Sequence, residues 1–274
     1  PGHRGLAMGL KQVGVPIGGI IAAGNGAIAE WYNWHSIMLF VALLIFLNGL
    51  LTANLLRFEN KNSPFRAANA YKGILQVIKD KNVNIFVWSN GFLNFGRTNF
   101  FSFLALFLTE VALASQSLAG IALGCVHAVS ALARIAWGNL SDSAFSGRRS
   151  KLLTWLCLAA VVFLSGLSIV GPGVSMWTIG LLSIVGLGMT IASYAPVGQA
   201  IGVEMVTPRL AGSAMGFNMV GIHVGGMIGP IVFGIIVDWA GNYQISWLTT
   251  AATVAVGTAL IALYFKEGEK LVQK

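Results

Sequence analysis

The chain has 274 residues, of which 56% are hydrophobic and only 9% are charged, and its net charge is +8. A soluble domain needs about 25% charged residues to face water, so this composition excludes a soluble globular protein. The basic residues fall in short clusters between apolar runs and do not form one binding face, which excludes a nucleic-acid-binding protein.

Eight apolar stretches follow one another along the chain, and each is long enough to cross a bilayer as a helix. They lie at residues 9–29, 34–56, 84–108, 117–140, 151–170, 176–201, 211–237 and 245–265. The predicted fold class is therefore all-α, a polytopic membrane protein with the lipid bilayer as a partner over most of its surface.

The positions of lysine and arginine predict the orientation of these helices. Fifteen of the 17 basic residues lie in alternate loops and in the two end segments, and the opposite loops contain only the acids Glu30, Glu110 and Asp238. Loops rich in lysine and arginine stay in the cytoplasm. We therefore expect both ends of the chain to be cytoplasmic and the protein to lie in a plasma membrane, such as a bacterial inner membrane. The other two basic residues, Arg97 and Arg134, lie inside predicted helices.

An internal repeat relates the first predicted helix to the seventh. Ala7-Met8-Gly9 returns as Ala214-Met215-Gly216, and the offset of 207 residues also joins Val13 to Val220, Gly14 to Gly221, Gly18 to Gly225 and Gly19 to Gly226. Duplication explains this better than convergence on glycine-rich packing. It predicts a six-helix unit at 83–265, a linker at 57–82, a tail at 266–274, and at 1–56 the last two helices of an earlier unit. The start at Pro1 fits a fragment whose partner is the missing first four helices of the same protein.

Three stretches resemble the major facilitator superfamily of transporters. The first is Gly138-Asn-Leu-Ser-Asp142 followed by Gly147-Arg148-Arg149, the second is the glycine series that ends in Gly229-Pro230, and the third is Arg4-Gly-Leu-Ala-Met-Gly. The resemblance implies the superfamily fold and maps the chain onto helices five to twelve of twelve. The Lys11-Gln12 opening of the first helix is also similar to the cyanate permease-like branch, which handles organic anions.

A carrier that opens alternately to each side needs contacts that form in one state only. The charged residues that the resemblance assigns to the cytoplasmic side predict such a latch: Asp142, Arg148, Arg149, Glu204 and Arg209, together with Gly138 in the same motif. Asp142 is also suited to cap a neighbouring helix N-terminus. Arg134, two turns earlier, is predicted to pair with Asp142 or Glu204 as a gate. The alternative for Arg148 and Arg149 is that they only determine topology.

The candidate substrate site centres on Arg97, because an arginine inside a spanning helix is costly and is a functional hypothesis by default. Asn90, Asn94, Arg97 and Phe101 recur at helical spacing and share one face. The resemblance places this helix at the central cavity, where a guanidinium suits a carboxylate, sulfonate or phosphonate. A structural arginine, bonded to backbone carbonyls or to an acid on the missing helices, is the alternative.

Three further residues are weaker candidates for the cavity: His127, His223 and Gln12. Each histidine could relay protons or donate to an anion, although a packed histidine is as good an explanation. The glycine-rich positions are predicted to serve helix packing, namely Gly14, Gly18, Gly221, Gly225, Gly229 and Pro230.

The mid-membrane parts of the eight predicted spans contain no aspartate or glutamate, which favours an organic anion over a cationic substrate. The predicted function is secondary transport of a small carboxylate-like solute, with a proton or a counter-anion as coupling partner. Drug efflux by proton antiport is the alternative within transport, and a membrane sensor without turnover is the alternative from another class. No enzyme motif, metal site or cofactor motif is present, and the sequence leaves the direction of transport open.

Overall fold

A computed structural model describes residues 4–29, 33–56, 67–145, 148–171 and 173–268. Every regular element in this part of the chain is helical. The elements are α1 (Arg4–Gln12), α2 (Gly14–Ala29), α3 (Trp34–Leu56), α4 (Ala67–Lys79), α5 (Lys81–Glu110), α6 (Gln116–Ser143), α7 (Arg149–Ser168), α8 (Met176–Gly180), the π-helix η1 (Leu181–Leu187), α9 (Ala195–Glu204), α10 (Ala211–Ala240) and α11 (Gln244–Tyr264).

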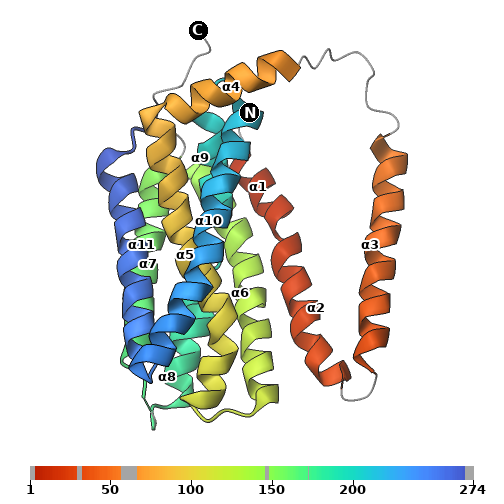
Figure 1. The fold of residues 1–274 in the computed structure, drawn as a ribbon, viewed down its shortest axis with the longest axis vertical. Helices are drawn as coiled ribbons and strands as arrows, with labels where there is room; N and C mark the ends of the chain where they lie inside the picture. The colour runs from red at the N-terminus through yellow and green to blue at the C-terminus, as the bar shows by residue number, and fades with distance from the viewer. Residues whose placement is uncertain (1–3, 30–32, 57–66, 146–147, 172, 269–274) are drawn as a thin grey trace.

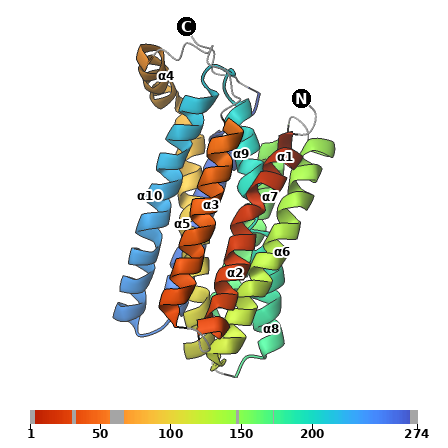
Figure 2. The same cartoon turned by 90° about the vertical axis from the view of Figure 1, so that its right-hand side faces the viewer.

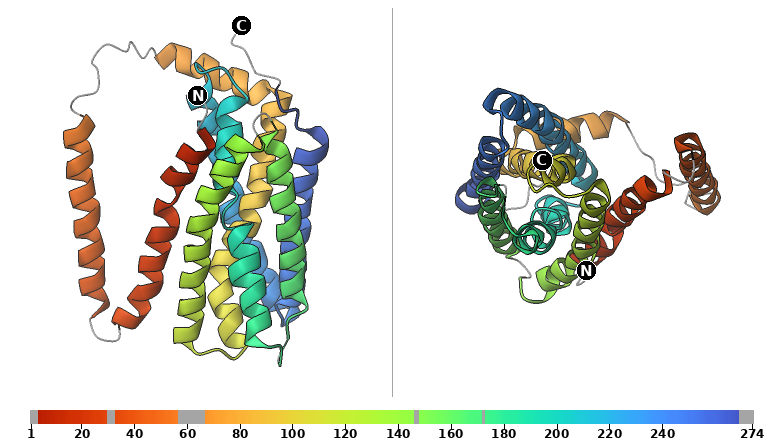
Figure 3. Two further views of the ribbon diagram at one scale, coloured as in Figure 1. Left: turned by 180° about the vertical axis from the view of Figure 1, so that it is seen from behind. Right: turned by 90° about the horizontal axis from the view of Figure 1, so that it is seen from below.

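The helices α5 to α11 form one bundle, and α1 and α2 lie along its side against α6 (Figure 1). Figures 1 and 3 show α3 apart from this bundle, on the far side of α2, and Figure 2 views the bundle from the side on which α3 stands in front of it. The described side chains of α3 are almost all exposed, whereas large side chains such as Trp247, Phe86 and Phe100 are fully buried inside the bundle. The hydrophobic core therefore belongs to the later part of the chain.

Six helical stretches of the described chain are long and apolar enough to cross a membrane. They are Arg4–Ala23, Met38–Leu55, Gln116–Ser143, Arg149–Ser168, Ala211–Ala240 and Gln244–Tyr264. The other two predicted spans are α5, which carries several polar residues along its 30 residues, and the interrupted α8–η1–α9 segment. In Figure 1, α5 runs through the bundle from one end to the other, and α8 and α9 lie near its opposite ends.

Two of the predicted continuous spans are interrupted. The first, expected at 9–29, divides at Val13 into α1 and α2. The sixth, expected at 176–201, consists of α8, a π-helical stretch, a turn near residues 188–194 and α9. Each interruption lies a few residues before a proline, Pro16 in the first case and Pro196 in the second.

The segment predicted as an extended polar linker at 57–82 contains a helix. Residues 57–66 lie outside the described part of the chain, but α4 lies across the end of the bundle (Figure 1). Gly73 and Val77 of α4 are buried, and Gly73 approaches Ser213 of α10. Asp80 then accepts a hydrogen bond from the Val83 backbone N–H at 2.8 Å and caps α5.

Candidate functional site

Arg97 lies in the middle of α5 and is partly buried. One Nη donates to Asn94 Oδ1 at 3.2 Å, and the guanidinium carbon lies 5.6 Å from the centre of the Phe101 ring. The buried Nε–H has no hydrogen-bond acceptor among the described residues. A buried donor without a partner costs free energy, so Arg97 can donate a further hydrogen bond to an acceptor group on a ligand.

The two asparagines on the Arg97 face contact different neighbouring helices. The Asn94 amide donates to the Ile222 carbonyl of α10 at 2.8 Å, so Asn94 joins Arg97 to α10. The Asn90 amide instead donates to the Phe86 carbonyl of its own helix, and its Oδ1 faces Gly198 of α9. Asn94 therefore orients Arg97 directly, whereas Asn90 belongs to the α5–α9 contact.

An aromatic pair extends from Arg97 towards α2. Phe101 stacks on His127 of α6, with ring centres 4.7 Å apart and planes 10° apart. A Cβ atom added to Gly19 of α2 would collide with the His127 ring, so the histidine fills the space between α6 and α2. The sequence predicted Arg97 and Phe101 on one helical face and His127 as a separate candidate, and the structure brings the three side chains together.

Arg134 of α6 is fully buried, and its partners differ from those expected. Its guanidinium donates to Gln12 Oε1 at 2.7 Å, to the Gln12 carbonyl at 3.3 Å, to the Ala192 carbonyl at 2.7 Å and to Ser130 Oγ at 3.2 Å. The predicted pairing with Asp142 or Glu204 is therefore wrong, because both acids are bonded to Arg149. Gln12, predicted as a cavity residue, is a ligand of Arg134.

A second polar cluster lies where α1 and α7 begin and α6 and α9 end. The Asp142 carboxylate accepts hydrogen bonds from the backbone N–H groups of Gly5 and Leu6, both at 2.8 Å, and thus caps α1. Arg149 lies 2.8 Å from Asp142 and also donates to Ser141. One carboxylate therefore holds α1, α6 and α7 together.

Arg149 also makes a two-pronged contact with Glu204 at the end of α9. Its Nε and one Nη lie 2.9 and 3.2 Å from the two carboxylate oxygens. This geometry is among the stronger ion-pair arrangements in proteins. We call Asp142, Arg149, Glu204 and Glu267 the latch cluster.

Glu267, beyond the end of α11, is the member that sequence reasoning missed. Its carboxylate accepts hydrogen bonds from the backbone N–H groups of Arg149 at 2.6 Å and Ser150 at 2.9 Å, and it contacts Ser150 Oγ. Glu267 therefore caps α7. Glu267 lies in the predicted tail, where no motif or helical spacing in the sequence indicated that it caps a helix.

Other predicted residues lie outside both clusters. Arg148 and Arg209 are exposed and are not members of the latch cluster. His223 is exposed, and its Nδ1 lies 2.7 Å from the Met219 carbonyl of its own helix. The structure therefore does not bring His223 to Arg97.

The packing glycines divide into two groups. Added Cβ atoms at Gly221, Gly225 and Gly229 of α10 would collide with backbone atoms of α5, and Gly138 meets Gly5 of α1 in the same way. Pro230 lies within α10. Gly14 and Gly18 of α2, by contrast, have no atom within 4 Å of an added Cβ. The packing role predicted for these two glycines is not met by contacts among the described residues.

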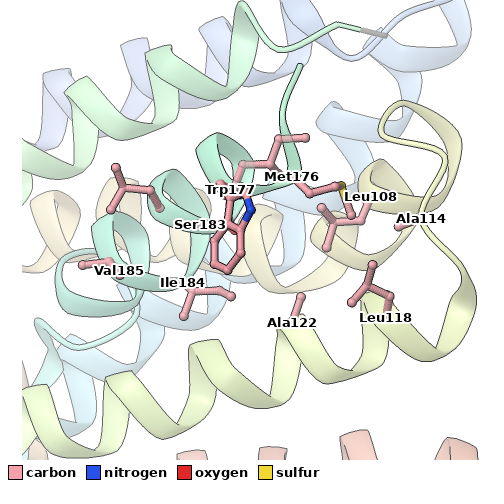
Figure 4. A pocket seen from close by; sticks show the side chains of 12 residues that line it. Leu108, Ala114, Leu118, Ala122, Met176, Trp177, Ser183, Ile184 and Val185 are labelled. Atoms are coloured by element: carbon pink, nitrogen blue, oxygen red, sulfur yellow. The ribbon is translucent and has the colours of Figure 1, made fainter. Parts of the chain in front are cut away.

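An apolar cavity of about 440 Å³ lies near the end of the bundle opposite the latch cluster. Figure 4 shows Leu108 of α5 and Leu118 and Ala122 of α6 facing Trp177 and Ile184 across it. Ser183 supplies the polar exception in the lining, and its hydroxyl donates to the Ile179 carbonyl. The cavity suits an apolar group.

The same end of the bundle carries one further polar contact. The Tyr243 hydroxyl donates to Glu110 Oε2 at 2.8 Å. Burial, followed by this hydrogen bond, raises the pKa of Tyr243 above its ordinary value. No group of three metal-ligating side chains converges among the described residues.

Comparison with known proteins gives a consistent family. The sequence model described as Major Facilitator Superfamily matches residues 1–192 and 86–273. The multidrug resistance protein MdtG of Proteus mirabilis is 29% identical over 170 residues, covering 60% of this chain and 40% of that protein. MdtG of Serratia proteamaculans is 27% identical over 177 residues, covering 63% and 41%. The chain thus spans about two-fifths of the length of the curated relatives it matches.

Among solved structures, the Escherichia coli fucose:proton symporter FucP matches with a TM-score of 0.64 and 17% identity, over 80% of this chain and 53% of that chain. A FucP structure described as being in the outward conformation gives the same TM-score at 18% identity, with the same coverage. At this identity the likeness concerns the fold alone.

Proposed function

We propose that this chain, which belongs to the major facilitator superfamily, forms part of a secondary carrier for small organic anions that works by alternating access. The observation that carries the proposal is Arg97, whose buried Nε–H has no acceptor among the described residues. A carboxylate is the ligand that best fits a guanidinium with free donors, because its two oxygens match the fork of N–H groups.

The second arginine, Arg134, supports Arg97 as the anion-binding residue, because its own hydrogen-bond donors are already bonded to protein groups. Arg134 donates to Gln12, Ser130 and Ala192, so its hydrogen bonds go to neutral groups of the protein. It contributes positive charge to the region without competing for the ligand. Within the described part of the chain Arg97 contacts no acid, so an anion would supply the missing charge.

Phe101 and His127 supply a wall beside the guanidinium. The stacked rings extend from Arg97 to α2, and Gly19 closes against His127. A flat apolar wall next to a cationic group suits a carboxylate whose remaining atoms are apolar or aromatic. His127, which stacks on Phe101 beside Arg97, is our candidate for proton coupling, with exchange against a second anion as the other coupling mode.

The latch cluster is the proposed gate of the cytoplasmic side. It binds the first turn of α1 to α6, α7 and α9 through Asp142, Arg149 and Glu204. Opening this side requires α1 to leave Asp142, which removes two charge-assisted hydrogen bonds.

Drug efflux is the second candidate, favoured by the multidrug resistance relatives and by the apolar cavity at Trp177 and Leu108. The two candidates differ in the charge of the transported compound. An amphipathic cation would avoid Arg97, whereas a carboxylate would require it.

Uptake by the complete protein in proteoliposomes, measured across a panel of carboxylates and cationic drugs, tests the proposal. Losing a buried charged contact costs about 2–5 kcal/mol, so Arg97→Ala should reduce carboxylate transport by about thirtyfold or more. Arg97→Lys should retain part of it, and Arg209→Ala, which removes an exposed arginine, is the matched control. Normal carboxylate transport by Arg97→Ala would overturn the proposal, and drug transport unaffected by Arg97→Ala would favour the second candidate.

A further inference from the structure

The two interrupted spans share one chemical defect. In an α-helix the carbonyl of residue i accepts a hydrogen bond from the N–H of residue i+4, and proline has no N–H. Pro16 therefore leaves the carbonyl of Gln12 without its helical donor, and Pro196 does the same to the carbonyl of Ala192. Both carbonyls lie inside segments that were predicted to cross the membrane, where a buried carbonyl needs a hydrogen-bond donor from the protein.

One guanidinium satisfies both of these carbonyls. Arg134 donates to the Gln12 carbonyl at 3.3 Å and to the Ala192 carbonyl at 2.7 Å, from its two different Nη atoms. Ser130, one turn earlier on α6, adds a second donor to the Ala192 carbonyl at 3.0 Å and accepts from Arg134 Nε. Two helices that proline deprives of a backbone donor are thus bonded to α6 through the same side chain.

The contacts of Arg134 with Ala192 and its contacts with Gln12 are not equivalent. Ser130, Arg134 and Ala192 all belong to the bundle of α5–α11, so their contacts lie within one packed body. Gln12 lies at the junction of α1 and α2, which pack on the side of this bundle against α6 and α9 (Figures 1 and 3). The Gln12 contacts therefore cross an interface that can separate without unfolding the bundle.

We propose that Arg134 is a positioning residue for the conformational cycle. Ser130 and Ala192 hold its guanidinium in every state, and it engages Gln12 only when α1 and α2 are packed on α6. Pro16 is part of the same device, because it leaves the Gln12 carbonyl available to the arginine. The inference does not depend on the substrate, so it stands or falls separately from the organic-anion proposal.

The test measures the ratio of packed to separated states in the complete protein. Spin labels are attached through Ala7→Cys on α1 and Asn139→Cys on α6, both exposed positions, after the exposed Cys125 is replaced by serine. Pulsed electron–electron double resonance in lipid then gives the distribution of distances between the labels on α1 and α6. Melting temperature is measured in parallel as the readout of a purely structural role.

Arg134→Gln should lower the packed-to-separated ratio by about tenfold, since hydrogen bonds from a charged donor are lost at Gln12. Arg134→Lys, which keeps the charge but loses the fork, should fall between this variant and the native protein. Pro16→Ala restores the missing N–H and should shift the ratio in the same direction by a smaller factor. Added to Arg134→Gln, it should have almost no further effect, because both changes act on one carbonyl.

Pro230→Ala is the matched control, because it also restores an N–H within a spanning helix but at a carbonyl that Arg134 does not reach. It should leave the ratio unchanged. If Arg134→Gln does not fold, Gln12→Ala and Pro16→Ala carry the same test with the arginine in place. An unchanged ratio in these variants, additive effects of Pro16→Ala and Arg134→Gln, or an equal shift in Pro230→Ala would each overturn the proposal.

Discussion

The α1–α2 segment and α10 carry the same sequence register 207 residues apart, yet they are built differently. At the position of Pro16 in the first segment, α10 has His223 and continues as one helix. Gly225 of α10 packs on the backbone of α5, whereas the equivalent Gly18 of α2 contacts nothing within 4 Å. A repeated motif therefore specifies where a helix can approach another closely, and the partner decides whether it does.

The beginnings of the two segments differ in the same sense. The first turn of α1 is capped from outside by Asp142 of α6, whereas α10 begins at Leu210 without a side-chain cap. The α1–α2 segment thus depends on α6 at its start and at its interruption, and α10 depends mainly on its glycine contact with α5. The segment that depends on polar contacts with α6 is the one that we propose separates from the bundle.

The largest effect is expected from Gly225→Val. Its Cβ would collide with the carbonyl group of Gly91, and a backbone collision cannot be relieved by a rotamer change. We expect the folded bundle not to accumulate, as judged by the yield of monodisperse protein in detergent.

Gly18→Val is the matched variant at the equivalent position and should give normal yield in this 274-residue chain. Equal damage at the two positions would contradict the contrast between α2 and α10. Damage at Gly18 that appears only in a longer form of the protein would indicate that a further helix packs there.

His223→Pro should convert α10 into a second interrupted helix. The change removes the N–H that serves the Met219 carbonyl, and no arginine is present in the described contacts of that carbonyl. Proline inside a helix costs about 3 kcal/mol, which should appear as a lower melting temperature. His223→Ala, which keeps the N–H, should remain close to the native value, and a harmless proline would show that α10 needs no continuous helix here.

Asp142→Asn should loosen the start of α1 and leave the start of α10 unchanged. The amide keeps the shape of the side chain but loses the charge that binds Gly5, Leu6 and Arg149. Charged hydrogen bonds are worth about 1.5–3 kcal/mol, so hydrogen exchange of the first turn of α1 should accelerate by about tenfold or more. Ser143→Ala, on the same end of α6, is the control, and equal acceleration in both variants would remove the special role of Asp142.

The smallest effects are expected at the arginines that precede each repeat. Arg4 lies 4.0 Å from Glu204 and is half-exposed, and Arg209 is exposed. Exposed ion pairs contribute little, so Arg4→Gln and Arg209→Gln should each change the free energy of unfolding by less than about 0.5 kcal/mol. A large loss in either variant, measured by thermal unfolding, would show that these arginines do more than mark orientation.

The sequence predicted the all-α membrane fold, the family resemblance and the order of the spans, because long apolar stretches carry that information locally. It did not predict α4, although Gly73 and Val77 recur at helical spacing, since the linker was treated as one polar segment. The sequence contains Pro16 and Pro196, but the interruptions depend on which distant side chain donates hydrogen bonds to the carbonyls that these prolines leave without a donor. Ser130, Arg134 and Trp137 share one face of α6, and that face supplies hydrogen bonds to Met189 and Ala192.

The candidate site was predicted in part for the same reason. Arg97 and Asp142 were identifiable because a charge or a motif marked them in the sequence, and Phe101 because it shares a helical face with Arg97. The neutral ligands of Arg134 and the cap made by Glu267 were not, because backbone carbonyls and N–H groups are present at every residue and leave no mark.

The crossing of α1 and α6 at Gly5 and Gly138 is a contact between two bare backbones. An added Cβ at either glycine would lie 2.5 Å from the carbonyl oxygen of the other. One methyl group, introduced by Gly138→Ala, would act as a wedge that favours the separated arrangement without touching Arg97 or the latch carboxylates. Such a variant would serve as the antigen for raising antibodies that recognise only the separated arrangement of α1 and α6.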